Sequence, residues 1–530
     1  MTIVDAVAGN AVERFVLAPE RGRGDATLLV DAASGREWSR RDVADGVRRA
    51  AAALAERGVQ PEQRVLLVCA DTPTFLWFFW GAMWIGAVPV PVSTMLAEAD
   101  YRFVLDDSRA VGLVVSAPFA STVGAAALGA PFLRFALVDG DADMPGATPV
   151  DRALDGAGDP PETFPATPDD VAFWLYTSGT TGFPKGARHR HADLGACVDH
   201  YASGILRMEP ADRVYSVAKL FFAYGLGNAG YFPPATGASA ILNPVRPEPR
   251  AVADHVRTYR PTLFFGVPTF YAALLDADLP ADTFASVRAA VSAGEALPAD
   301  LHRRFRERFD VEILDGIGTT EVLHIFLSNR PGASVPGTSG VPVPGYEIEL
   351  RDAAGTAVPD GEPGNLWVAG DSVMVGYWNR TEQNRRVLHG RFMATGDEYL
   401  RRPDDGHYVY LGRSDDMLKV GGVWVSPAEV EACIVELDDV VQAAVVGGDA
   451  GDGLVKPRAF VVATADAARD DLAARVQAHV RARLAPYKYP RWVELVDELP
   501  TTATGKVKRY LLRQRPLPAR PADARPAEAG

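Results

Sequence analysis

A loop of hydroxyls and glycines at residues 176–186 (YTSGTTGFPKG) constrains this chain more than any other stretch. It follows the apolar run 171–175 (VAFWL), which is typical of a buried strand. Four hydroxyls, three glycines whose backbone can approach a ligand, and one lysine are groups that hold a polyphosphate. Taken alone, the composition equally fits an ordinary surface loop, because Gly, Ser, Thr and Pro are the commonest loop formers.

The loop differs from the best-known phosphate-binding motif, G-x-x-x-x-G-K-[ST]. Here Lys185 comes three residues after Gly182, with Phe183 and Pro184 between them. This spacing excludes a P-loop nucleoside triphosphatase. The choice between a phosphate site and a surface loop therefore depends on the rest of the chain.

Composition describes a soluble globular protein with room for two or more domains: 530 residues, 48% hydrophobic and 23% charged. The net charge of −14 argues against a nucleic-acid partner, because such proteins neutralise phosphates with Lys and Arg. Cys69, Cys197 and Cys433 lie far apart without a C-x-x-C pair, and residues 1–20 carry no secretory signal. We therefore expect a cytoplasmic protein.

One apolar run, residues 75–92, has to be weighed as a membrane span. A span needs about 20 uninterrupted apolar residues. Gly81 and Gly86 interrupt this run, and it ends with Pro89 and Pro91. The pattern favours a buried helix followed by a core strand, and we expect no membrane span.

Short apolar runs alternate with helical patterns through the first half of the chain, which indicates a parallel sheet covered by helices. Ser39 and Asp42 have the spacing of a capping box at the start of one such helix. Residues 337–412 are punctuated by Gly and Pro and read as β-rich. We expect an α/β protein whose large N-terminal domain (1–414) contains two α/β layered subdomains and a β-rich, barrel-like subdomain. A small mobile α+β domain (415–515) and a disordered tail (516–530) complete it.

Residues 225–230 (GLGNAG) match the dinucleotide fingerprint G-x-G-x-x-G, which would suggest an NAD-dependent oxidoreductase. That fold needs a helix at this point and an acidic residue about 20 positions further on. Pro233 and Pro234 shorten any such helix, and Glu248 lies in a proline-rich turn. We expect these glycines to serve close packing or to line a pocket.

Four further motifs follow in order: 314–321 (LDGIGTTE), 395–397 (TGD), 412–416 (GRSDD) and 500–506 (PTTATGK). Each has an ordinary explanation by itself, such as surface acids, a salt bridge or a basic tail. In this order and spacing, together with the loop, they resemble the superfamily of adenylate-forming enzymes. That superfamily includes acyl-CoA synthetases, firefly luciferase and peptide-synthetase adenylation domains, and the resemblance runs from about Trp38 to Lys506.

The resemblance implies a two-step reaction that uses ATP, Mg²⁺ and CoA. A carboxylate attacks the α-phosphate of ATP to give an acyl-AMP, and a thiol then displaces AMP. By similarity, the β- and γ-phosphates are held by Thr177, Ser178, Gly179, Thr180, Thr181, Gly182 and Lys185. Thr320 and Glu321 would lie at the α-phosphate and the metal, since a carboxylate plus substrate phosphates is the usual setting of Mg²⁺.

The remaining nucleotide contacts are implied in the same way. Asp397 and Arg413 would hold the ribose. Two segments would enclose the adenine: Gly294, Glu295 and Ala296, and Asp315, Gly316 and Ile317. Ile317 replaces the tyrosine of the family's Y-G-x-T-E motif, and this departure removes an aromatic ring that would stack there.

The small domain would serve both steps. Lys506 matches the lysine that bridges the carboxylate and the α-phosphate in the first step. Asp415 matches the hinge about which the domain swings for the second step. That movement would bring Lys419, Gly421 and Gly422 to the CoA.

Two segments, 219–228 (KLFFAYGLGN) and 321–329 (EVLHIFLSN), resemble the benzoate and hydroxybenzoate CoA ligase branch. Phe222, Ala223, Tyr224 and His324 would form a flat, mostly apolar slot suited to an aromatic acid. These segments contain no obvious partner for an ammonium group, which disfavours an amino acid. The alternative for His324 is a buried core histidine whose hydrogen bonds are all made within the protein.

Several alternatives stay open at this point. A stand-alone adenylating enzyme would load the aryl acid onto a carrier protein instead of CoA. A luciferase-like oxygenase shares the first step, but no residue favours it. The chain gives no sign of its oligomeric state, and a homodimer is compatible with it.

Overall fold

The computed structural model describes residues 9–177, 184–414, 416–420, 423–449, 455–501 and 507–517. The chain divides into two compact units, one made of residues 1–395 and 400–409 and the other of residues 396–399 and 410–530. The boundary predicted at 414/415 stays a prediction, and the predicted hinge residue Asp415 lies outside the described residues, as does most of the predicted tail.

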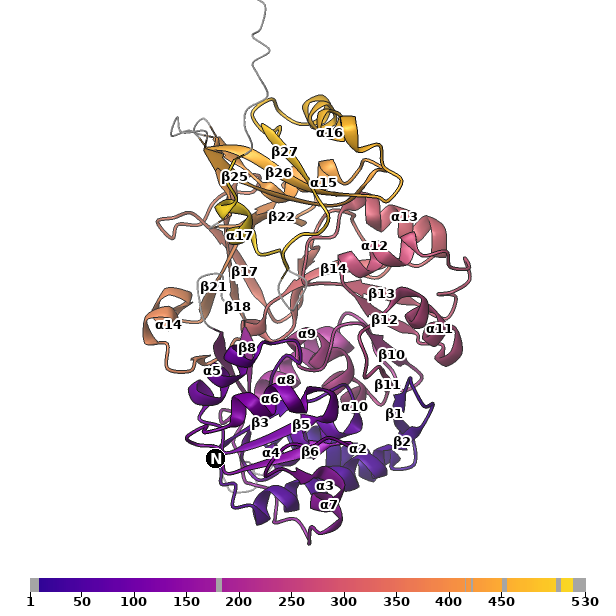
Figure 1. Ribbon diagram of the computed structural model, residues 1–530, viewed down its shortest axis with the longest axis vertical. Helices are drawn as coiled ribbons and strands as arrows, with labels where there is room; N and C mark the ends of the chain where they lie inside the picture. Colours follow the sequence, from indigo (N-terminus) through magenta and orange to yellow (C-terminus); the bar gives the residue numbers. More distant parts are fainter. Residues whose placement is uncertain are drawn as a thin grey trace, which may run out of the picture. The chain divides into compact units, whose positions relative to one another are not determined.

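The largest sheet of the first unit has the strand order β16-β15-β14-β13-β12-β10-β11-β1-β2. Its central strands run parallel, as the alternation of strands and helices predicts. Helices α11 (Pro249–Tyr259), α12 (Pro268–Asp276) and α13 (Ala299–Phe309) lie along one side of it and share a buried core with it (Figure 1). The strands are β1 (Thr27–Asp31), β2 (Glu37–Ser39), β10 (Arg213–Ser216), β11 (Ser239–Leu242), β12 (Leu263–Gly266), β13 (Ala289–Ser292), β14 (Ile313–Gly318), β15 (Ile325–Ser328) and β16 (Val341–Pro342).

A second, parallel sheet has the order β4-β3-β5-β6-β7. Its strands are β3 (Arg64–Val68), β4 (Val88–Pro91), β5 (Gly112–Ser116), β6 (Phe135–Asp139) and β7 (Thr148–Pro149). The helices between and before these strands are η1 (Glu13–Leu17), α2 (Ala18–Arg23), α3 (Arg40–Glu56), α4 (Pro73–Trp84), α5 (Glu98–Ser108), η2 (Ala117–Phe119), α6 (Ala120–Ala127) and α7 (Val150–Asp155). Ser39 and Asp42 form the predicted capping box at the start of α3.

The apolar run 75–92 forms helix α4 and then strand β4, as predicted. Nearly every residue of α4 is buried, because the helix packs against α3 and carries Phe75, Phe78, Phe79 and Trp80 into the core. Within the described ranges, no helix combines the length and the apolar character needed to cross a bilayer.

The predicted phosphate loop connects two antiparallel strands, β8 (Val171–Thr177) and β9 (Lys185–Arg190), and Thr177 pairs with Lys185. The loop residues 178–183 lie outside the described residues. Strand β19 (Gly376–Tyr377) pairs with the other edge of β9. Helix α8 (His191–Cys197) and η3 (Val198–Ser203) follow β9.

The region predicted to be β-rich forms a sheet of order β17-β18-β21-β20, in which β22 also pairs with β21. Its elements are β17 (Glu347–Arg351), β18 (Pro363–Ala369), α14 (Thr381–Val387), β20 (Leu388–His389), β21 (Phe392–Arg401) and β22 (Tyr408–Arg413).

The second unit contains a hairpin and a three-stranded sheet of order β25-β26-β27 with helices beside it. Its remaining elements are β23 (Leu418–Val420), β24 (Val423–Val425), α15 (Pro427–Ile434), β25 (Val440–Asp449), β26 (Val455–Ala463), α16 (Arg469–Arg483), β27 (Trp492–Val496) and α17 (Arg509–Gln514). Its core joins Val430 and Ile434 of α15 to Val476 and Val480 of α16. The predicted fold class, a large α/β and β-rich unit with a small α+β unit, is confirmed.

His191 at the start of α8 fixes the N-terminal segment. Its Nδ1 accepts a hydrogen bond from the backbone N–H of Ala11 at 3.1 Å, so this nitrogen carries no hydrogen. Burial lowers the pKa of His191 from 6.5 to about 4. Protonation would break the bond and leave a buried charge.

We expect this histidine to make the stability of the protein depend on pH. The unfolded chain takes up the proton near pH 6.5 while the native histidine resists it until about pH 4, so stability is complete above that range and falls within it. Between about pH 7.5 and about pH 5, the wild type should lose about 2 kcal/mol more than His191→Gln in urea unfolding followed by tryptophan fluorescence. His389→Gln, at an exposed histidine, should keep the wild-type slope. Equal slopes for all three proteins would contradict this role.

Candidate functional site

One tyrosine of the first unit contacts both the predicted phosphate lysine and the predicted metal carboxylate. The Nζ of Lys185 lies 4.8 Å from the centre of the Tyr377 ring, and the Tyr377 hydroxyl donates to Glu321 Oε1 at 2.6 Å. Tyr377 is 4% exposed and is held in register because β19 pairs with β9. Residues that are distant in sequence thus form one cluster with a cation and a carboxylate.

Glu321 itself lies in a short 3₁₀ turn, η5 (Thr320–Val322), which Thr319 caps by accepting from Val322 N–H. Its backbone is also fixed, because Glu321 O accepts from Met374 N–H at 2.8 Å. Tyr377 was not predicted from the sequence, although it contacts two predicted site residues, Lys185 and Glu321.

Removal of the Tyr377 hydroxyl should loosen the Glu321 carboxylate without removing it. A hydrogen bond to a charged group contributes about 1.5–3 kcal/mol, so we expect Tyr377→Phe to slow adenylation about tenfold or more at limiting Mg²⁺. Excess Mg²⁺ should recover part of the rate. The measurement is pyrophosphate release against Mg²⁺ concentration, with Tyr399→Phe, a buried tyrosine of the second unit, as the control. An unchanged Mg²⁺ dependence would refute the positioning role of Tyr377.

His189 is a second residue that the sequence did not reveal. It is fully buried on β9, with Nδ1 3.0 Å from Asp193 Oδ2 and Nε2 2.8 Å from the carbonyl oxygen of Thr320. Both ring nitrogens therefore face acceptors, and both contacts are hydrogen bonds only when each nitrogen carries a hydrogen. Asp193 also accepts from the backbone and side chain of Arg190. This network ties the strand that follows the loop to the turn that carries Glu321.

The chain between Glu321 and His324 contains a tight turn. Leu323 has φ +70°, and His324 N–H donates to Val322 O at 2.9 Å, which makes a γ-turn of the rarer, strained form. Such strain at a functional site is kept only where the surroundings fix it. Here the turn separates Glu321, which accepts from Tyr377, and His324, which contacts Asn228.

The predicted adenine segments belong to two neighbouring parallel strands, β13 and β14: Gly294, Glu295 and Ala296 follow β13, whereas Asp315, Gly316 and Ile317 lie within β14. Gly294 has φ +95°, a conformation that favours glycine. Asp315 is buried, and burial raises its pKa well above the usual range of a carboxyl group. Its Oδ1 and the neighbouring Ser292 Oγ have no hydrogen-bond partner within the described part of the chain. Buried polar atoms of this kind are ready to bind a polar ligand edge.

In the second unit, the two residues predicted to hold the ribose, Asp397 and Arg413, contact each other. Arg413 Nη1 lies 3.1 Å from Asp397 Oδ1, and Asp397 is 6% exposed. Gly396 precedes it with φ +76°, and a side chain there would meet the Arg413 guanidinium. The pair holds the carboxylate in one orientation.

The segment predicted to bind the acid packs around His324. Tyr224 lies 5.7 Å from His324 between ring centres, and the Tyr224 hydroxyl donates to Val291 O. Phe222 stacks edge-on against Phe221. A Cβ on Gly227 would come within 2.3 Å of the His324 ring, so the second glycine of G-x-G-x-x-G serves close packing, as predicted. The glycines lie in α9 (Ala223–Gly225) and η4 (Leu226–Tyr231), which α10 (Phe232–Thr236) continues.

A chain of hydrogen bonds fixes the tautomer of His324. Ser216 Oγ donates to Ala218 O, Asn228 Nδ2 donates to Ser216 Oγ, and His324 Nε2 therefore donates to Asn228 Oδ1 at 3.1 Å. The Nδ1 atom is left as a buried acceptor with no partner among the residues described. Burial lowers the pKa of His324 to about 3, so the ring is neutral.

A buried ion pair between Lys219 and Asp71 holds the start of the predicted acid-binding segment 219–228. Lys219 Nζ donates to the carbonyls of Asn243 and Val245 and lies 3.7 Å from Asp71 Oδ2. Asp71 Oδ1 accepts from Leu220 N–H. Burial raises the pKa of Asp71, and Lys219 opposes that shift. Nothing in the sequence connects Asp71 to the segment, because the two are far apart in the chain.

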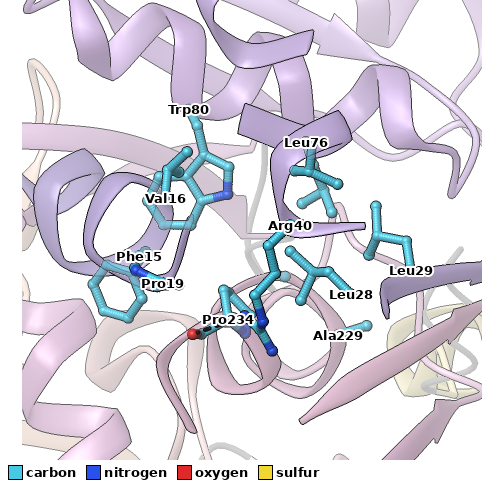
Figure 2. Close-up of a pocket in the computed structure, with 12 residues that line it drawn as sticks. Phe15, Val16, Pro19, Leu28, Leu29, Arg40, Leu76, Trp80, Ala229 and Pro234 are labelled. Carbon is cyan, nitrogen blue, oxygen red and sulfur yellow. Dashed lines mark hydrogen bonds between the residues drawn. The ribbon is translucent and has the colours of Figure 1, made fainter. Parts of the chain in front are cut away.

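A small cavity of about 10 Å³ lies between η1, α4 and η4 (Figure 2). It is lined by apolar side chains such as Phe15 and Trp80 and by the buried Arg40, which donates to Pro234 O and Ala238 O. The volume fits about one water molecule. Its lining, over the described residues, includes none of the predicted acid-binding side chains, so it is separate from the predicted slot.

Of the remaining predicted residues of the second unit, Gly421, Gly422 and Lys506 lie outside the described residues. The backbone of Lys419 pairs with that of Trp424 across the β23–β24 hairpin.

The described residues on either side of 502–506 are bonded to each other. Thr501 and Val507 form a β-bridge, and Lys508 N–H donates to Pro500 O at 2.7 Å. Arg509 makes two bonds to the Glu431 carboxylate, at 2.7 and 2.8 Å.

The chain matches the AMP-binding enzyme family over residues 18–378 and the AMP-binding enzyme C-terminal domain over residues 429–506. It is 45% identical over 518 residues to a benzoate–CoA ligase of Thauera aromatica, which covers 96% of this chain and 95% of that protein. It is 42% identical over 519 residues to a 4-hydroxybenzoate–CoA/benzoate–CoA ligase of Rhodopseudomonas palustris, with 97% and 94% covered. A solved benzoate CoA ligase from Burkholderia xenovorans LB400 aligns with a TM-score of 0.88 and 46% identity, with 95% and 99% covered.

Proposed function

Because this chain belongs to the AMP-binding enzyme family, we propose that it joins an aromatic carboxylic acid to CoA. The carboxylate attacks the α-phosphate of ATP to form an aryl-AMP and release pyrophosphate. The CoA thiol then attacks the aryl carbonyl and AMP leaves. The products are aryl-CoA, AMP and pyrophosphate, and the enzyme is an AMP-forming acid–thiol ligase.

The observation that carries this proposal is the cluster in which Tyr377 contacts both Lys185 and Glu321. Two anions must meet in the first step, and their repulsion is the main barrier that the protein can lower. A lysine at the end of the loop and a positioned carboxylate for a divalent cation address that barrier by positioning and electrostatics. Thr177, the last residue of β8, pairs with Lys185, so these two predicted phosphate-binding residues are neighbours across the β8–β9 pair.

Glu321 fits Mg²⁺ by the chemistry of its donors. Mg²⁺ is usually bound by one or two carboxylates plus substrate phosphates, and Tyr377 occupies only one oxygen of this carboxylate among the bonds described. Bound there, Mg²⁺ would neutralise phosphate charge. The chain's own contribution is to orient the carboxylate through Tyr377 and to hold the turn through His189.

The nucleotide roles rest on the match to the family. The unpartnered oxygen of Asp315 in β14 and the positive φ of Gly294 after β13 support an adenine site at these two neighbouring strands. The Asp397–Arg413 pair supports ribose binding, since a fixed carboxylate can accept from both ribose hydroxyls. Lys506 is assigned to the first step, Asp415 to the hinge, and the hairpin residue Lys419 with Gly421 and Gly422 to CoA.

An aromatic acid is the best-supported substrate class. The rings of Tyr224 and His324 contact each other, Phe222 contacts Phe221, and the small side chain of Ala223, between Phe222 and Tyr224 in the sequence, is buried. The neutral His324 contributes a buried acceptor and no charge. The relatives named benzoate–CoA ligases point to the same class.

Pyrophosphate release with a panel of acids tests the substrate class. We expect benzoate to turn over fastest, hydroxy- and aminobenzoates more slowly, and cyclohexanecarboxylate and medium-chain fatty acids slowest. A fatty acid that turns over faster than every aryl acid would overturn the assignment.

The acceptor and the partners are the finer part of the proposal. CoA is the acceptor named for the benzoate relatives. A separate carrier protein is the alternative acceptor. The protein could assemble as a homodimer instead of remaining a monomer. Comparison of CoA with a phosphopantetheinylated carrier protein as acceptor, and light scattering of the pure protein, distinguish these cases.

A further inference from the structure

A cluster of three metal-ligating side chains lies in the second unit, apart from every residue assigned above. Cys433 lies in α15, Glu436 lies just beyond its end, and His479 lies in α16. One ligand atom from each lies within 4.8 Å of the other two. Glu436 Oε2 and His479 Nε2 are 3.0 Å apart.

The backbone holds these three residues together. Glu436 N–H donates to Cys433 O at 3.4 Å, which continues the helical turn and places both side chains on one face. Helices α15 and α16 pack through Val430, Val476 and Val480. The cluster is thus preorganised by the core of the unit and does not depend on a flexible loop.

The donor set and the spacing suit zinc. Zn²⁺ takes sulfur, imidazole nitrogen and carboxylate oxygen, and tetrahedral geometry places such ligand atoms about 3.3–3.7 Å apart. The separation of 3.0 Å between Glu436 and His479 is slightly shorter than that range, and every ligand atom lies within 4.8 Å of the others, so small rotations of the side chains are enough to close the site. Cys433 is 5% exposed, whereas 34% of the Glu436 side chain is exposed, which gives an ion a path from solvent.

We propose that Cys433, Glu436 and His479 form a zinc-binding site that clips α15 to α16. Three protein ligands leave a fourth position for water, as in other sites with three ligands. Arg483 also contacts Glu436 Oε2 and is the cation that the metal has to displace. Arg483 therefore lowers the affinity of the site.

Metal binding to the full chain tests this proposal, with Zn²⁺ for stoichiometry and Co²⁺ as a spectroscopic probe. We expect one ion per chain and a thiolate-to-cobalt charge-transfer band. Cys433→Ala should abolish the band, and Cys69→Ala, at a buried cysteine of the first unit, should keep it. His479→Gln should weaken Zn²⁺ binding at least tenfold, and Arg483→Gln should tighten it.

Three results would overturn the site: less than one ion bound per wild-type chain, a band that survives Cys433→Ala, or equal Zn²⁺ affinity of the wild type and His479→Gln. If Cys433→Ala fails to fold, His479→Gln and Arg483→Gln test the site instead, because their side chains lie nearer the surface. The first should weaken Zn²⁺ binding and the second should tighten it.

Discussion

Replacement of Lys506 by alanine is expected to slow aryl-AMP formation on the order of 10²-fold or more, the loss associated with one donor to the transition state. The same variant should form aryl-CoA from supplied aryl-AMP and CoA at nearly the wild-type rate. The reason is that the second step has no pyrophosphate to separate from the acid, so its charge problem is smaller. Single-turnover assays of the two half-reactions measure the difference.

Lys508→Ala is the matched control for Lys506→Ala, because it removes the same charge two residues further along the chain. The backbone there is fixed by Lys508 N–H and Pro500 O and by the Arg509–Glu431 pair, so neither variant should unfold the segment ends. Equal loss of both half-reactions in Lys506→Ala would contradict the separation of roles.

Glu321→Gln is expected to lower adenylation by roughly 10²–10³-fold, because it removes a negative charge from the place assigned to the cation while it keeps the shape of the side chain. Tyr377 can still donate to the amide oxygen, so the turn should remain. The effect should appear mainly in kcat at saturating ATP and should shift the Mg²⁺ dependence.

Glu307→Gln on α13 is the control for Glu321→Gln, since its side chain is 67% exposed and lies on the surface of the same unit. A Glu321→Gln enzyme with wild-type adenylation would remove Glu321 from the site. Loss of folding, visible in thermal melts, would instead mark the residue as structural.

The fold could be predicted from the sequence because the patterns that indicate helices and strands are local. Alternating apolar runs predicted the parallel sheets, the Ser39–Asp42 pair predicted the start of α3, and glycines and prolines predicted that residues 75–92 form a helix and a strand. Each of these follows from the preferences of neighbouring residues, which a single sequence contains.

The site was only partly accessible to the same reasoning. The glycines of 225–230 serve packing as expected, whereas Asp397 and Arg413 lie in contact and their predicted role at the ribose stays a prediction. Three contacts that position the site residues were missed, because they join elements far apart in the chain: Tyr377 with Glu321, His189 with Thr320, and Asp71 with Lys219. Such contacts depend on register and packing, and no local pattern encodes them.

The central claim is that this protein makes an aryl-CoA through an aryl-AMP. Mass spectrometry of the products formed from ATP, Mg²⁺, CoA and an equimolar pool of aryl and alkyl acids tests it most directly, because it identifies acid and acceptor together. We expect benzoyl-CoA as the main thioester, with AMP and pyrophosphate formed in equal amounts. An alkyl-CoA as the main product, or ADP in place of AMP, would contradict it.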